Sequence, residues 1–191
     1  VKMNIVIISG SNRKNSQSIK VAEICNSVLN NLSVNTSLID LSKSNLPLWD
    51  ELDTKLNSHP FRKISQSLMK AMGFVFVVPE WGGMVPPQVK NLFLLSSNQE
   101  LSHKPGLIIT ISASSGGAYP LAELRSYSYK NTRICWIPDH VIIRNVEKFS
   151  YEPGERISER INYSCKMLIE YAKALKPIRK VADYQKFKNG M

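Results

Sequence analysis

The sequence predicts an α/β domain with a doubly wound parallel sheet. Three observations lead to this fold class. Apolar runs of strand length recur along the chain, segments with helical spacing of apolar residues lie between them, and a polar Gly/Ser loop follows the first run. Such alternation gives parallel strands joined by right-handed crossovers. The 191 residues suit one domain, here 1–191, with a basic tail over about 176–191.

The first half of the chain contains two predicted strands and two predicted helices. The apolar β-branched run 4–9 is typical of a strand buried on both faces. Apolar residues over 18–32 recur with helical spacing, and the alternation over 34–41 predicts a second, more exposed strand. A loop covers 42–58, and 59–72 has the apolar side of a helix.

The second half continues the alternation. Pro120 falls in the first turn of one predicted helix, where proline is tolerated. Five parallel strands fit the order 2-1-3-4-5 of a flavodoxin-like three-layer sandwich, in which ligands bind at the carboxyl ends of strands one, three and four. The remaining elements are strands at 73–79, 106–111 and 133–143, and helices at 88–97, 118–130 and 153–175.

Composition excludes several classes of protein. No apolar run approaches the roughly 20 residues needed to span a bilayer, and no signal peptide is recognised, so we expect a cytoplasmic protein without a membrane partner. Cys25, Cys135 and Cys165 are odd in number and far apart, which is typical of buried small hydrophobes in a reducing compartment. The three histidines are not spaced with them as zinc ligands, so no metal site is predicted.

The chain is strongly basic, with a net charge of +10 and a pI of about 9.6. This charge suits a phosphorylated cofactor or an anionic substrate. It also permits nucleic-acid binding, which is the alternative interpretation. We do not expect nucleic acid as a partner, because the sequence contains no recognised nucleic-acid module. The basic residues are concentrated only at 173–188, which we interpret as a solvated tail.

The loop after the first strand, residues 9–18, is predicted to bind a phosphate. Gly10 allows a sharp turn and a close approach to a ligand. Arg13 can donate two charge-assisted hydrogen bonds, and the first N–H groups of the following helix are free. The alternative is that Ser16 only caps the helix. The predicted binding residues here are Ser11, Arg13, Ser16, Gln17 and Ser18.

Three other phosphate motifs are absent from this loop. A G-x-G-x-x-G dinucleotide fingerprint is excluded because Gly10 stands alone, and no G-x-x-x-x-G-K-[ST] loop is present. A phospho-acceptor domain would need acidic residues after the first strand to hold magnesium, and Ser9-Gly10-Ser11 has none.

The next two loops are predicted to hold a flat ring and its polar edge. We expect the ring to lie against the backbone of Glu80 to Gly83, with Trp81 and Met84 adding apolar surface. The alternative is that the two glycines only shape a turn and that Trp81 is part of the core. The predicted contacts of these two loops are Pro79, Glu80, Trp81, Gly82 and Gly83, and then Ser112, Ser115, Gly116 and Gly117.

These motifs resemble those of the NAD(P)H-dependent FMN reductases, a flavodoxin-like group that includes quinone, chromate and azo-dye reductases. The resemblance covers roughly 3–175. Trp81-Gly82 stands where the family usually has Tyr-Asn, and Pro87 where it has Gly, so Gly82 offers only its backbone. The matching segments are Gly10-Ser-x-Arg13-x-x-Ser16, then Pro79-Glu80-Trp81-Gly82 with Pro86 or Pro87 and Lys90-Asn91, then Ser112–Gly117 with Leu124-Arg125.

The resemblance implies an oxidoreductase that binds FMN and uses NAD(P)H to reduce flavin, quinone or a similar small-molecule acceptor by hydride transfer through flavin N5. Such a reaction needs no side-chain acid or nucleophile, so no catalytic residue is named. Glu80 is expected to make a structural contact rather than to act as a base, and His140 to be structural.

The resemblance also implies a homodimer or homotetramer, and the apolar stretches 46–49 and 92–95 are candidate contacts. The alternative function is a flavin-binding electron carrier or redox-sensing module without nicotinamide turnover. Flavodoxin carriers are usually acidic, so the charge of +10 argues against a carrier.

Overall fold

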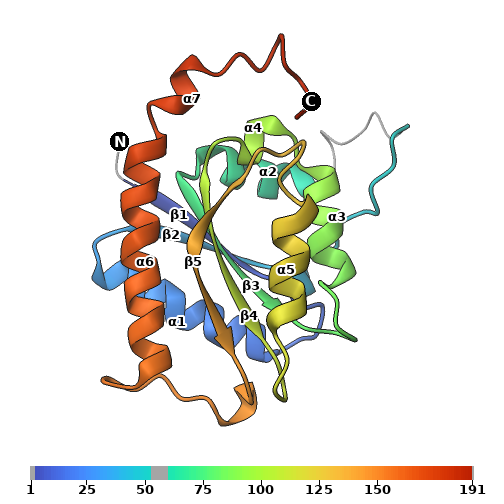
Figure 1. Ribbon diagram of the computed structural model, residues 1–191. Coiled ribbons are helices and arrows are strands. Elements are labelled where there is room, and N and C mark those ends of the chain that lie inside the picture. Colours follow the sequence, from blue (N-terminus) through green and yellow to red (C-terminus); the bar gives the residue numbers. More distant parts are fainter. Residues whose placement is uncertain (1–2, 53–59, 191) are drawn as a thin grey trace.

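The structure, a computed structural model, describes residues 3–52 and 60–190. Its five strands form one parallel sheet in the order β2-β1-β3-β4-β5, which confirms the predicted flavodoxin-like order (Figure 1). The strands are β1 (Asn4–Ser9), β2 (Asn35–Asp40), β3 (Gly73–Pro79), β4 (Pro105–Ile111) and β5 (Cys135–Ile143).

Helices cover both faces of the sheet and give three layers (Figure 1). One face packs on α1 and α6, and the other on α2, α3 and α5. No helix in the described ranges is long and apolar enough to cross a membrane. The helices are α1 (Gln17–Asn31), α2 (Phe61–Lys70), α3 (Pro87–Leu95), α4 (Asn98–Leu101), α5 (Ala118–Tyr127), α6 (Arg156–Leu175) and α7 (Ile178–Val181), with 3-10 turns η1 (Leu41–Lys43) and η3 (Val146–Lys148).

The alternation of side chains along the strands creates the two cores. In β1, Ile5 and Ile7 point to the α1/α6 side, while Val6 and Ile8 point to the opposite side. All seven residues of β3 are buried, because this central strand is covered on both faces. This rigid centre fixes the positions of the loops that leave the carboxyl ends of the strands.

Several helix boundaries differ from the prediction. Helix α6 begins at Arg156 rather than at 153, because Gly154 adopts a φ of +84° in the preceding turn. Strand β5 begins at Cys135, after Arg133 with a φ of +51°. It tolerates Pro138 because it is an edge strand with a register shift opposite β4. The predicted start of α2 at His59 lies outside the described residues.

The basic tail follows a defined path across the amino ends of β4 and β5 (Figure 1). The Arg133 guanidinium donates to the carbonyl oxygen of Phe187 at 2.6 Å, and the Tyr184 ring stacks on His103 with a centroid distance of 5.9 Å. The basic side chains of Lys186 and Lys188 are exposed. The backbone of this segment is therefore attached to the fold although its charges face solvent.

Candidate functional site

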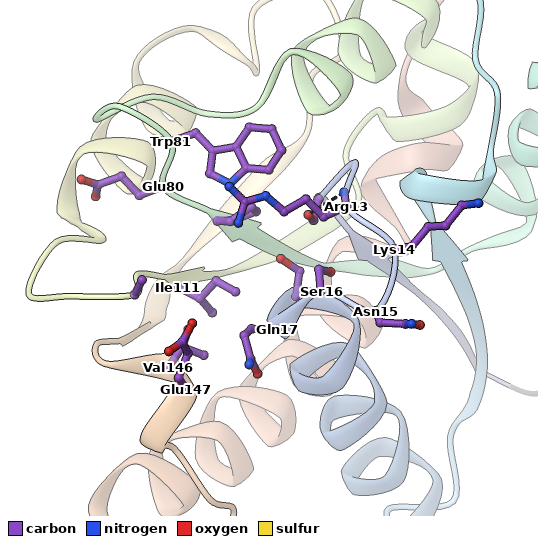
Figure 2. Close-up of a pocket in the computed structure, with 14 residues that line it drawn as sticks. Arg13, Lys14, Asn15, Ser16, Gln17, Glu80, Trp81, Ile111, Val146 and Glu147 are labelled. Atoms are coloured by element: carbon purple, nitrogen blue, oxygen red, sulfur yellow. Dashed lines mark hydrogen bonds between the residues drawn. The ribbon is translucent and has the colours of Figure 1, made fainter.

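A cavity of about 340 Å³ opens where β1, β3 and β4 end (Figure 2). This volume is at the lower end of the usual range for small-molecule sites, about 300–1,000 Å³. The cavity brings together the first two predicted loops. Of the predicted site residues it is lined by Ser11, Arg13, Ser16, Gln17, Ser18, Pro79, Glu80 and Trp81.

The serines of the first loop present hydrogen-bond donors to the cavity. Ser16 is the N-cap of α1, and its Oγ accepts from the N–H of Ile19 at 3.3 Å. Ser11 Oγ accepts from the N–H of Arg13 at 3.1 Å. Both hydroxyls can still donate their own proton. The cap predicted for Ser16 is therefore present and compatible with anion binding.

Ser18 is the strongest single indication of a ligand. Its side chain is only 1% exposed, it lines the cavity, and its Oγ has no hydrogen-bond partner among the described residues. A buried hydroxyl without a partner is unfavourable by about 1–3 kcal/mol. The first N–H groups of α1 also lack intrahelical acceptors. A phosphate at this helix start would satisfy both kinds of donor.

Gly10 packs closely against β3 and α3. Its N–H donates to Val77 O at 2.8 Å. A Cβ at this position would lie 2.7 Å from Val89 Cγ2 and 3.0 Å from Val77 O. Gly10 is therefore required so that the loop can pack against β3 and α3. The close approach that the structure shows at Gly10 is to the protein itself, and Gly10 is not among the residues that line the cavity.

Arg13 and Trp81 face each other across the cavity mouth (Figure 2). The guanidinium carbon lies 5.2 Å from the centroid of the indole ring. Such a cation–π contact at an exposed site contributes about 0.5–1 kcal/mol, which is weaker than a charge-assisted bond to phosphate. Trp81 is half-buried at the rim, so it is not a core residue. Arg13 is exposed and able to turn toward an anion.

Gly82 and Gly83 form the tip of a tight hairpin. Trp81 and Met84 exchange backbone hydrogen bonds of 3.1 and 3.0 Å. The φ angles of +56° at Gly82 and +77° at Gly83 are those of a type I′ turn. A Cβ at Gly83 would come no closer than 3.9 Å to another residue, at Tyr119. Neither glycine lines the cavity, so this geometry supports the turn-shaping alternative.

Most of the Gly-rich loop after β4 packs against Glu80, and of this loop only Ala113 lines the cavity. The Glu80 carboxylate accepts from the N–H of Gly117, and a Cβ at Gly116 would lie 2.7 Å from Glu80 Oε1. Gly117 has a φ of +102° and caps α5. Glu80 thus makes the structural contact that was predicted, as a backbone hydrogen bond. The predicted contacts Ser112, Ser115, Gly116 and Gly117 are absent from the cavity lining.

Several lining residues were not predicted. Val146 and Glu147 come from η3, after the edge strand β5, where no motif marks them. They reach the site because Val146 N–H donates to Ser112 O at 3.0 Å and Asn145 N–H to Ser114 O at 2.9 Å. Only the adjacency of β4 and β5 could have indicated them. The unpredicted lining residues are Lys14, Asn15, Ile111, Ala113, Val146 and Glu147.

Comparison with known proteins finds a similar sequence and structures of the same fold. A curated relative, the NADPH azoreductase of Bacillus sp. (strain OY1-2), is 23% identical over 178 residues, 93% of this chain and 97% of its own. A solved NADH:FMN oxidoreductase in its apo form shares the fold with a TM-score of 0.70 at 16% identity, covering 98% of this chain and 95% of its own.

A flavoenzyme NAD(P)H:(acceptor) oxidoreductase from Paracoccus denitrificans also shares the fold, with a TM-score of 0.63 at 15% identity over 93% of this chain and 98% of its own. The sequence model of the NADPH-dependent FMN reductases matches residues 3–148, well over half of the chain. The expected class, cofactor and electron donor are thereby confirmed: the chain belongs to the NADPH-dependent FMN reductase family, oxidoreductases that use FMN with NAD(P)H.

Proposed function

We propose that this protein reduces flavin, quinone or a similar small-molecule acceptor with electrons from NAD(P)H, using FMN held in the cavity of Figure 2. The FMN phosphate would bind the loop 11–18, and the ring would extend toward Trp81. The observation that carries this placement is the buried, unpartnered hydroxyl of Ser18 at the start of α1.

The residues of the first loop fit a phosphate group. Ser11, Ser16 and Ser18 provide hydroxyl donors, and Arg13 and Lys14 provide two exposed cations beside them. The net charge of +10 attracts anionic ligands over a longer range. Since the donors converge on one helix start, the protein does not have to rearrange its backbone to bind the phosphate.

FMN, when bound, would supply the chemistry of hydride transfer through its N5, and the loop 11–18 and Trp81 would hold it in place. The protein would position the ring and limit access of water. Glu80 is already engaged by Gly117, which supports a structural role. Tyr119 and Met84, 70% and 55% exposed beside the hairpin, offer apolar surface to a planar acceptor.

We also propose a homodimer or homotetramer in the cytoplasm. Leu48 and Leu94, from the two stretches singled out in the sequence, are 84% and 57% exposed, and exposed apolar side chains of this kind are typical of subunit contacts. The location is proposed because the three cysteines are odd in number and free, a usage typical of a reducing compartment.

The test combines binding with turnover. Titration of the purified protein with FMN should quench flavin fluorescence with a saturable 1:1 stoichiometry. NAD(P)H consumption should then accelerate when a quinone or an azo dye is added. Flavin binding without NAD(P)H consumption would instead identify an electron carrier or a redox sensor, and the absence of flavin binding would refute the proposed function.

A further inference from the structure

Helix α3 carries the Lys90-Asn91 pair, whose role the flavin site does not explain. Asn91 is buried and holds the neighbouring loop, because its Oδ1 accepts from Trp49 N–H at 2.8 Å and its Nδ2 donates to Pro47 O at 2.7 Å. Lys90 points elsewhere: its Nζ lies 2.5 Å from Glu123 Oε1 on α5. The pair therefore connects α3 to two separate segments.

Glu123 is the centre of the second connection. Its Oε1 accepts from Lys90 and from the hydroxyl of Tyr127, and its Oε2 accepts from the backbone N–H of Val85 at 2.5 Å. Burial raises the pKa of Glu123, but the hydrogen bonds from Lys90, Tyr127 and Val85 outweigh it and lower the pKa below its ordinary value. The Glu123 carboxylate thus accepts hydrogen bonds from three donors.

Val85 directly follows the Trp81–Met84 hairpin. Two adjacent glycines at the tip make this hairpin costly to order, since glycine loses the most conformational freedom on folding. At its start, Glu80 N–H donates to Ile111 O at 2.9 Å. At its end, the bond from Val85 to Glu123 is the one side-chain hydrogen bond made by residues 81–85 within the described part of the chain.

We propose that Glu123 is a positioning residue for the flavin site: it fixes the Trp81–Met84 hairpin at the ring end of the cavity, and Lys90 and Tyr127 orient its carboxylate. This inference rests on the proposed function, because it assumes that the ring lies beside Trp81. Glu123 itself does not line the cavity, so it acts through the hairpin.

Two flavins separate this effect from the phosphate loop. Riboflavin has the ring of FMN but no phosphate. If Glu123 positions the ring end, Glu123→Ala should weaken FMN and riboflavin by the same factor, about tenfold, the scale of one hydrogen bond to a charged group. Arg13→Ala should weaken FMN alone. The visible circular dichroism of bound flavin should change in Glu123→Ala, since it reports the surroundings of the ring.

Matched variants complete the design. Glu123→Gln keeps an oxygen for Val85 N–H and should recover most of the flavin affinity. Lys90→Met should give an intermediate loss of flavin affinity, and it replaces Glu123→Ala if that variant does not fold. Glu170→Ala removes an exposed carboxylate that pairs with Lys173 on α6, and it should change nothing. Hydrogen exchange at the Val85 amide should be slow in the wild type and faster in Glu123→Ala.

The outcomes distinguish the two proposals. Equal losses for both flavins, with faster exchange at Val85, support the positioning role. Unchanged affinities in Glu123→Ala, or a loss confined to FMN, would overturn it while leaving the proposed function intact. A wild-type protein that binds neither flavin would refute the proposed function itself. In that case the exchange rate at Val85 still decides whether Glu123 holds the hairpin.

Discussion

Ser18→Ala should change the stability of the free protein and its affinity for FMN in opposite directions. In the free protein the Ser18 hydroxyl is buried without a partner among the described residues, which is unfavourable by about 1–3 kcal/mol. Alanine removes that group with little loss of volume. The free variant should therefore be as stable as the wild type or more stable, by up to about 2 kcal/mol.

Binding should respond in the other direction. A hydroxyl that donates to a phosphate contributes about 1.5–3 kcal/mol, so Ser18→Ala should weaken FMN at least tenfold. Urea unfolding of the free protein gives the stability, and a flavin fluorescence titration gives the affinity. Riboflavin, which lacks the phosphate, should bind both forms equally.

Ser164 provides a matched control. It is also fully buried with an unpartnered Oγ in the described structure, but it lies on α6 and does not line the cavity. Ser164→Ala should raise or preserve stability in the same way and leave FMN affinity unchanged. An unchanged FMN affinity in Ser18→Ala, or a clear loss of stability without flavin, would refute the placement of the phosphate at Ser18.

Four further predictions follow from the site and the fold. Arg13→Ala should weaken FMN by about 1.5–3 kcal/mol in the same titration, and an unchanged dissociation constant would remove Arg13 from the site. Gly83→Val should lower the melting temperature of the free protein, because a φ of +77° costs a branched residue about 1–3 kcal/mol. Any loss of FMN affinity should be explained by this loss of stability. A loss of FMN affinity at unchanged stability would instead support the predicted contact between Gly83 and the ring. Burial lowers the pKa of Lys104 to about 7, below its value of about 10.4 in an unfolded chain. Between these two pH values the unfolded state binds the extra proton, so Lys104 should make the free energy of unfolding rise with pH. Urea unfolding at pH 7 and 9 should show a smaller rise in Lys104→Met than in the wild type. Light scattering should give a dimer or tetramer, and Leu94→Lys should shift it toward monomer, whereas a wild-type monomer at micromolar concentrations would contradict the proposed assembly.

The sheet was predictable because its strands are encoded locally. The runs 5–8 and 73–79 are apolar without interruption and of strand length, which is typical of strands buried on both faces. The alternation with helices predicted parallel strands, and the order 2-1-3-4-5 was the flavodoxin-like order that five such strands fit. The short helices α4 and α7, four residues each, were missed because one turn has too few residues for a helical period.

The site was predictable only where one continuous segment builds it. The loop 11–18 combines serines, an arginine and a helix start, and all of its predicted residues line the cavity. The role of Gly10 depends on Val89, 79 positions away in the sequence, which no local pattern reveals. Glu147 and Glu123 reach the site region through strand order and helix packing, so their contribution required the structure.

The ratio of FMN affinity to riboflavin affinity tests the central claim most directly. We expect wild-type protein to bind FMN at least a hundredfold more tightly than riboflavin, since the phosphate gains about two charge-assisted contacts of about 1.5–3 kcal/mol each. The double variant Arg13→Ala/Ser18→Ala should lower this ratio by about a hundredfold, the contribution of the two contacts it removes, while still binding riboflavin as the wild type does. An unchanged ratio in the double variant would contradict a phosphate site at the start of α1.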